Sequence, residues 1–321
     1  MRRYTSTMKK RRFIKNALNH CYQRSVNGFL LFYTVTDYLV YFTIVCIAAT
    51  KYNVRIIKVC PMPDHVHLSC FCKTVKSLSA FMRYVNSLYA REFNRICHRE
   101  GELFQGTFGS APKVTDKDIR SNLIYVDNNP PERYLCRKSE EYRWNFLAYA
   151  TNNHPFSDKI IKRKATSYLK HAMDEVVATK GKGRFMPHAM ISRLFSKLDN
   201  SERNSLVDYI ITTYSVIDYN YSIDIFGSYE AMILAEHSTR GKEFDIDETF
   251  NGKRDDVYAR MSNILLSAGL VDDIHQVVSK ERQEKERLFL FLLGKTKATT
   301  NQIDCFLHIP PRCSKKQRKT K

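Results

Sequence analysis

Apolar positions that alternate or recur at helical spacing divide the first 150 residues into seven predicted elements. Strands are expected where strand-forming residues alternate, at 20–26, 54–60, 65–72 and 102–108. Helices are expected where apolar residues recur every three or four positions, at 37–51, 76–99 and 116–129. Asp37 is a plausible N-cap of the first helix, and Pro130 and Pro131 should end the third. The order β-α-β-β-α-β-α predicts an α+β fold, an antiparallel sheet with helices on one face.

The second half of the chain has a different pattern, which is mainly helical. Residues 151–185 are basic and loop-rich, so they are expected to link a first domain, 1–150, to a helical domain, 186–321. Near the end, a strong helical pattern at 281–293 is followed by a short apolar helix at 302–308 that opens with capping-box spacing. This pair, with the basic tail behind it, predicts a candidate helix-turn-helix.

The charge of the chain indicates the kind of partner it binds. Lys and Arg number 52 against 33 Asp and Glu, a formal net charge of +19. Residues 1–150 carry 24 basic and 11 acidic side chains, net +13, so most of the excess lies in the first domain. Such an excess favours a polyanion, and we expect a nucleic acid bound through salt-sensitive phosphate contacts.

Segments that would direct the chain to a membrane or out of the cell are not evident. The basic start of the chain is not followed by a signal-peptide core, and the longest apolar stretch, 39–50, is too short to span a bilayer. The nine cysteines show no C-x-x-C spacing. We therefore expect a cytoplasmic protein with reduced thiols and no membrane partner.

The clearest candidate ligands are the two histidines of His65-Val66-His67. On a strand, residues 65 and 67 face one side and Val66 the other, so two imidazoles would stand together on one face and could hold a divalent ion. A zinc site that adds Cys70 and Cys72 is the rival interpretation. Strand parity argues against it, because both thiols would lie on the opposite face from the imidazoles.

The second candidate is the pair of Tyr125 and Asn129 on the predicted helix 116–129. Residues four apart share a helix face, so the phenol and the amide oxygen should point the same way. A tyrosine and an oxygen ligand beside two imidazoles suit phosphodiester chemistry, in which a phenol attacks phosphorus next to a metal. Asn128 is the alternative third ligand.

Four motifs taken together resemble one known family. They are CPMPDHVHL at 60–68, LFQGTF at 103–108, IYVDNNP at 124–130 and YRWNF at 142–146. In this order they resemble the single-tyrosine HUH transposases, and within them the REP-associated tyrosine transposases. The resemblance covers about residues 15–150.

The resemblance implies a ferredoxin-like sheet, a divalent Mg²⁺ or Mn²⁺ held by His65 and His67 with Asn129 as third ligand, and Tyr125 as the nucleophile. It implies cleavage of single-stranded, hairpin-containing DNA without ATP, with the 5′ phosphate on tyrosine and a free 3′ hydroxyl. The chain departs from the family at Thr107, where an Arg is common, which puts one contact near the site in doubt. Related enzymes act as dimers or alone, so a monomer and a homodimer both stay open.

Three arginines on the predicted helix 76–99, Arg83, Arg91 and Arg95, are candidate contacts to the DNA backbone, or simply a solvated face. Two other functions fit part of the pattern. One is an RNA-binding module built on the same sheet, although its strands lack the stacking aromatic residues that such modules use. The other is a non-catalytic regulator that binds DNA through the helix-turn-helix.

Overall fold

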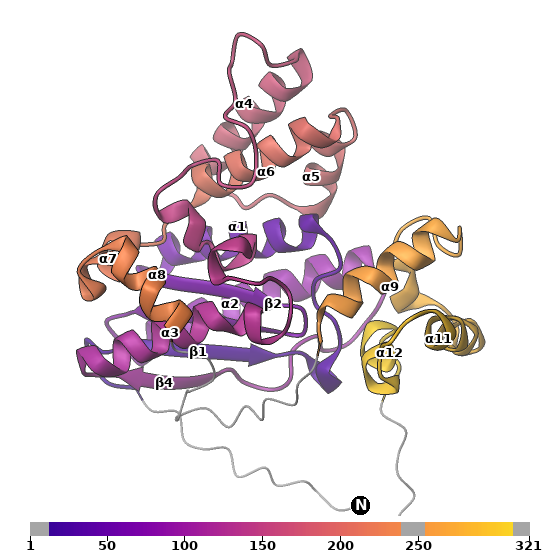
Figure 1. Cartoon of the computed structure of the whole chain (residues 1–321), viewed down its shortest axis with the longest axis horizontal. Helices are drawn as coiled ribbons and strands as arrows, with labels where there is room; N and C mark the ends of the chain where they lie inside the picture. The colour runs from indigo at the N-terminus through magenta and orange to yellow at the C-terminus, as the bar shows by residue number, and fades with distance from the viewer. Residues whose placement is uncertain (1–12, 239–253, 311–321) are drawn as a thin grey trace, which may run out of the picture.

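The computed structural model describes residues 13–238 and 254–310, and its centre is a four-stranded sheet (Figure 1). The strand order is β2-β3-β1-β4, and every neighbouring pair is antiparallel. The strands are β1 (Leu18–Arg24), β2 (Arg55–Met62), β3 (His65–Phe71) and β4 (Gly109–Lys113). The predicted α+β class, with an antiparallel sheet and a mainly helical remainder, is confirmed.

Two long helices, α1 (Val35–Tyr52) and α2 (Val75–Ile96), cover one face of this sheet. Cys21, Val66, Leu68 and Cys70 point to this side and are buried in the main apolar core with both helices. Strand residues two apart share a face, so the core takes one set of alternating side chains and leaves the other set to the opposite face.

The helix α3 (Asp116–Glu132) lies against that opposite face, which adds a third layer to the one-sided arrangement expected from the sequence. Ile119 and Leu123 of α3 form a small apolar cluster with Leu18 and Ile57 of the sheet. Helix α3 is amphipathic, so its apolar side chains need an apolar surface to pack against. The face of the sheet that α1 and α2 leave uncovered provides that surface.

Three predicted boundaries are wrong in detail. Thr34, not Asp37, is the N-cap of α1, and Asp37 is the reciprocal acidic residue of that capping box. The fourth strand is Gly109–Lys113 rather than 102–108, because the chain turns at Gly106, which has φ +56°, and residue 104 makes one isolated bridge. Helix α3 continues through Pro130 and Pro131 to Glu132, since prolines so near a helix end remove few hydrogen bonds.

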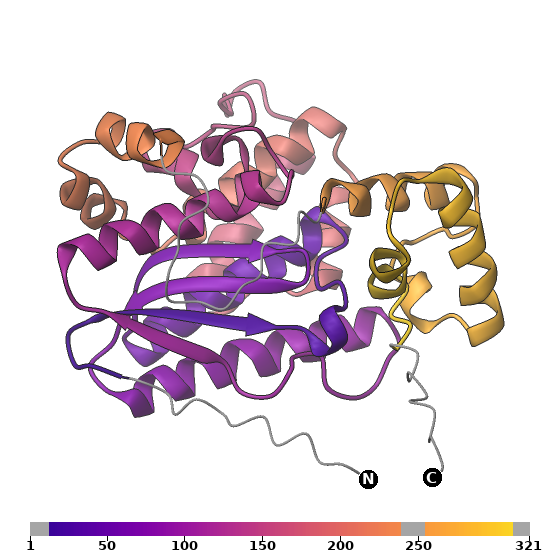
Figure 2. The same cartoon turned by 60° about the horizontal axis from the view of Figure 1, so that its bottom comes forward.

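The second half of the chain packs as helices around this core (Figures 1 and 2). Helices α5 and α6 pack against α1, α4 packs on α6, and α7 and α8 lie beside α3. The bounds are α4 (Ser167–Gly181), α5 (His188–Phe195), α6 (Asn200–Tyr214), α7 (Tyr219–Phe226), α8 (Tyr229–Ser238), α9 (Asp256–Ser267), α10 (Gln276–Ser279), α11 (Arg282–Lys295) and α12 (Thr300–Phe306). Short 3-10 turns are η1 (Val26–Gly28), η2 (Ser139–Glu141), η3 (Arg143–Asn145) and η4 (Leu147–Ala150).

The structure describes all of the predicted linker and both helices of the predicted helix-turn-helix. Part of the segment 151–185 is the helix α4. Helices α11 and α12 are adjacent, and α12 has the expected capping box. However, most of α12 is buried, and Leu30 and Tyr33 donate hydrogen bonds to its Cys305 and Phe306 carbonyls. Few of its side chains are therefore left to reach a base edge; the basic tail lies outside the described residues.

Within the part of the chain that the structure describes, no helix has the length and hydropathy needed to cross a bilayer.

Candidate functional site

The face of the sheet under α3 carries His65 and His67 side by side. Their ring centroids are 4.8 Å apart and their ring planes nearly perpendicular. Cys70 points to the opposite face and is buried in the apolar core, as strand parity predicts. The Cys/His zinc site is therefore excluded as an arrangement of these side chains.

His65 has the hydrogen-bonding pattern of a metal ligand. Its Nδ1 lies 2.6 Å from Oδ1 of Asp64, so the ring can donate to a carboxylate and present the lone pair of Nε2. That Nε2 is buried and has no hydrogen-bond partner among residues 13–238 and 254–310. A buried polar atom without a partner is costly, and a bound cation would satisfy it. The donors present therefore fit a divalent metal.

His67 is the end of a chain of hydrogen bonds that runs through the sheet face into α3. His67 Nδ1 lies 3.0 Å from His20 Nε2, His20 Nδ1 lies 2.8 Å from the Asn122 amide, and Ser69 Oγ bonds the other end of that amide at 2.8 Å. All four side chains are buried. His20, on β1 opposite Ser69, and Asn122, on α3, are site residues that the sequence interpretation missed.

The direction of proton donation along this chain depends on what His67 does at its other nitrogen. If His67 Nε2 gives its lone pair to a metal, then Nδ1 keeps the proton and donates to His20. His20 must then donate through its own Nδ1, so Asn122 must present its amide oxygen to His20 and its NH₂ to Ser69. Ser69 Oγ can accept as well as donate, so the chain takes this direction when the Asn122 amide is turned by 180° from the orientation in which its Nδ2 faces His20 Nδ1 and its Oδ1 faces Ser69.

Tyr125 lies over these imidazoles. Its ring centroid is 5.5 Å from that of His67 and 5.7 Å from that of His20, edge to face in both cases. The ring is only partly buried, so solvent still reaches it. The structure thus brings the predicted nucleophile together with one of the two predicted histidine ligands.

The two asparagines after Tyr125 have different roles. Asn129 Nδ2 donates to the Tyr125 carbonyl at 2.9 Å, which turns the amide oxygen away from that bond. Asn128 instead donates to the backbone of Glu236 at 2.9 Å and accepts from Ser139 at 3.1 Å. Asn128 is thus engaged on the far side of α3, so Asn129 is the better candidate for the third ligand.

A buried ion pair joins α3 to the sheet. Lys58 of β2 bonds Asp127 of α3, and both side chains are almost completely buried. Burial alone would lower the pKa of Lys58, but the neighbouring charge of Asp127 raises it above its ordinary value. Burial raises the pKa of Glu236 in α8 well above its ordinary value, and Asp127 raises it further. Burial and the neighbouring Asp127 carboxylate therefore both favour the protonated form of Glu236.

The predicted DNA-binding arginines are not at this site. Arg83, Arg91 and Arg95 are exposed, but they lie on α2, which covers the opposite face of the sheet. Arg24 of β1 is exposed and lies directly across the ladder from His65, on the histidine face. The alternation of the first strand could have indicated it, because residues 20, 22 and 24 share a face.

Comparison with known proteins gives a family match for one segment of the chain. Residues 33–129 match the family model described as "Transposase IS200 like", and the segment contains His65, His67, Tyr125 and Asn129. The resemblance to the single-tyrosine transposases that the motifs predict is thereby confirmed for that segment. A solved structure described as a REP-associated tyrosine transposase bound to a REP hairpin is similar over 49% of this chain and 93% of its own, at 15% identity and a TM-score of 0.39. A comparison with curated proteins gave no significant match.

Proposed function

We propose that this protein is a metal-dependent tyrosine transposase-like enzyme that cleaves and rejoins single-stranded, hairpin-containing DNA. The observation that carries the proposal is the packing of the Tyr125 ring against His67, next to a buried His65 nitrogen that has no hydrogen-bond partner among the described residues. A DNA-binding module needs neither feature. The family match of residues 33–129 supports a DNA-processing function.

In the proposed reaction the Tyr125 hydroxyl oxygen attacks a backbone phosphorus. A bond forms between that oxygen and phosphorus, the bond from phosphorus to the 3′ oxygen breaks, and the phenolic proton is given up as the 3′ hydroxyl gains one. The 5′ phosphate then stays on tyrosine, and attack by a 3′ hydroxyl reverses the step, so no ATP is needed. A Mg²⁺ or Mn²⁺ ion held by His65, His67 and Asn129 would supply charge neutralisation at the phosphate.

The remaining residues orient these groups. Asp64 and His20 fix the two imidazoles, and α3 carries Tyr125 and Asn129 on one turn. Arg24, across from His65 on the histidine face, is proposed as a phosphate contact.

The test is formation of a covalent adduct. Wild-type protein incubated with labelled single-stranded hairpin DNA and Mg²⁺ or Mn²⁺ should give a species that survives SDS, and peptide mapping should place the nucleotide on Tyr125. Tyr125→Phe and His65→Ala should give no adduct yet still bind DNA. Tyr84→Phe, the same change at a partly buried tyrosine on α2, is the matched control and should react like wild type.

Two results would contradict the proposal. An adduct mapped to another tyrosine would overturn the assignment of the nucleophile. DNA binding without any adduct, in either metal, would favour the non-catalytic regulator.

A further inference from the structure

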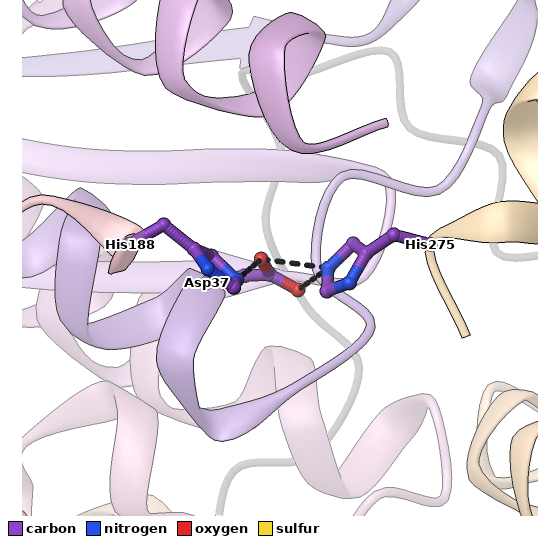
Figure 3. A group of neighbouring side chains, drawn as sticks. All are labelled: Asp37, His188 and His275. Carbon is purple, nitrogen blue, oxygen red and sulfur yellow. Dashed lines mark hydrogen bonds and ion pairs between the residues drawn. The ribbon is translucent and has the colours of Figure 1, made fainter. Parts of the chain in front are cut away.

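A second group of potential metal ligands lies on the other side of the sheet, at the start of α1. The Asp37 carboxylate lies between two imidazoles that come from distant parts of the chain, His188 of α5 and His275 just before α10 (Figure 3). His275 Nε2 is 3.0 Å from both carboxylate oxygens, and His188 Nε2 is 3.5 Å from Oδ1. All three side chains are buried.

A contact at Nδ1 orients each imidazole so that its Nε2 faces the Asp37 carboxylate. His275 Nδ1 is 2.7 Å from the Asp273 carboxylate, and His188 Nδ1 is 3.3 Å from Ser192 Oγ. Each ring can thus donate through Nδ1 and present the lone pair of Nε2, which is the usual arrangement behind a metal-bound histidine. His188 Nε2 is buried and forms no hydrogen bond with any described residue.

The two oxygens of Asp37 have different surroundings. Oδ2 accepts hydrogen bonds from the backbone N–H groups of Tyr33 and Thr34, at 2.9 and 2.8 Å, and so caps α1. Among residues 13–238 and 254–310, no backbone N–H donates to Oδ1, the oxygen that lies 3.5 Å from His188 Nε2. Oδ1 is therefore the oxygen available to a cation.

We propose that Asp37, His188 and His275 form a structural site for a divalent transition metal, with Zn²⁺ as the expected ion. Tetrahedral zinc with bonds of about 2.0–2.1 Å places neighbouring ligand atoms roughly 3.3 Å apart. The two nitrogen–oxygen separations of 3.0 and 3.5 Å bracket that value, and all three ligand atoms lie within 4.8 Å of one another. Two nitrogens and one oxygen suit zinc and not Mg²⁺, which prefers oxygen ligands.

Local charge favours the same ion. With both histidines neutral, the buried carboxylate of Asp37 and the exposed carboxylate of Asp273 behind His275 together balance a charge of 2+. The ligands belong to α1, to α5 and to the segment before α10, so a bound ion would tie two helical parts of the second half to the sheet domain. The site is separate from the proposed catalytic site, which lies on the opposite face of the sheet, and it does not depend on that function.

The alternative is a metal-free cluster in which His275 alone donates to Asp37. The experiment that separates the two starts from full-length protein dialysed against a chelator and then titrated with Zn²⁺. We expect one equivalent of zinc by elemental analysis, and a rise in Tm of roughly 5 °C at a free zinc concentration a hundredfold above the Kd. Titration with Co²⁺ should give the visible absorption bands of a tetrahedral site.

Variants assign the ion to this cluster. His188→Gln and His275→Gln should each lose the equivalent of zinc and the rise in Tm. His171→Gln, at an exposed histidine paired with Glu175, is the matched control and should keep both. His65→Ala should also keep both, which distinguishes this ion from one at the catalytic site.

Several outcomes would overturn the site. They are a wild-type Tm that neither chelator nor Zn²⁺ changes, a zinc content that His188→Gln does not lower, and a loss of zinc in His65→Ala instead. If His188→Gln or His275→Gln fails to fold, the Co²⁺ spectrum of His65→Ala protein still decides, because that protein lacks a ligand of the proposed catalytic site and a metal-free Asp37 cluster gives no tetrahedral bands.

Discussion

Replacing Lys58 with methionine tests whether the buried ion pair under α3 is what holds the proposed nucleophile in place. Methionine keeps most of the length and apolar character of the lysine stem but removes the charge. The side chains of Lys58 and Asp127 are 4% and 0% exposed, so the change leaves the Asp127 carboxylate buried without its cation.

The expected cost follows from that burial. Removing one partner of a buried pair costs about 3–5 kcal/mol, because the remaining charge stays desolvated. The matched control is Arg55→Met, which breaks the ion pair that Arg55, the first residue of β2, forms with Asp218. There the side chains are 53% and 29% exposed, and such a pair contributes about 0–1 kcal/mol.

Urea unfolding followed by circular dichroism measures both free energies of unfolding, and adduct formation measures the site. Lys58→Met should lose several times more stability than Arg55→Met, and its adduct yield should fall because Asp127 is two residues from Tyr125. The double variant Lys58→Met/Asp127→Leu should recover most of the stability, since it removes both buried charges. Equal losses in Lys58→Met and Arg55→Met would refute the reasoning.

Three further predictions address other parts of the structure. Asn122→Leu interrupts the hydrogen-bond chain behind the proposed metal ligands and should weaken Mn²⁺ binding roughly 10- to 100-fold by calorimetry; unchanged affinity would show that the chain does not orient them. Burial raises the pKa of Glu236 in the folded protein. The stability that the protonated side chain contributes to the fold is therefore lost as the pH rises through that raised pKa. Glu236→Gln should therefore raise Tm relative to wild type by an amount that grows as the pH rises above the ordinary carboxyl pKa and levels off above the raised pKa, while Glu230→Gln, exposed on the same helix, should not. Gly109→Ala places a Cβ 2.1 Å from Cζ of Tyr22 and should cost about 1–3 kcal/mol in urea unfolding; a neutral effect would mean that the ring moves freely.

Local patterns in the sequence determine much of the sheet domain and of its histidine face. Alternation along β3 is enough to place His65 and His67 together and Cys70 in the core, because side chains of a strand have a period of two. Helical spacing likewise places Tyr125 and Asn129 on one turn of α3. These inferences need only the backbone geometry of a single element.

Tertiary structure alone decided the features that depend on distant parts of the chain. Asn122 contacts His20, 102 positions away in the sequence, and His275 contacts Asp37, 238 positions away. The local periodicity of the sequence predicts neither contact. The fourth strand was misplaced for a related reason. Its residues, Gly109–Lys113, have a weak strand pattern, and they form a strand because β1 offers an unpaired edge to which their backbone can bond. Periodicity shows which way a side chain points, but only packing decides what it meets.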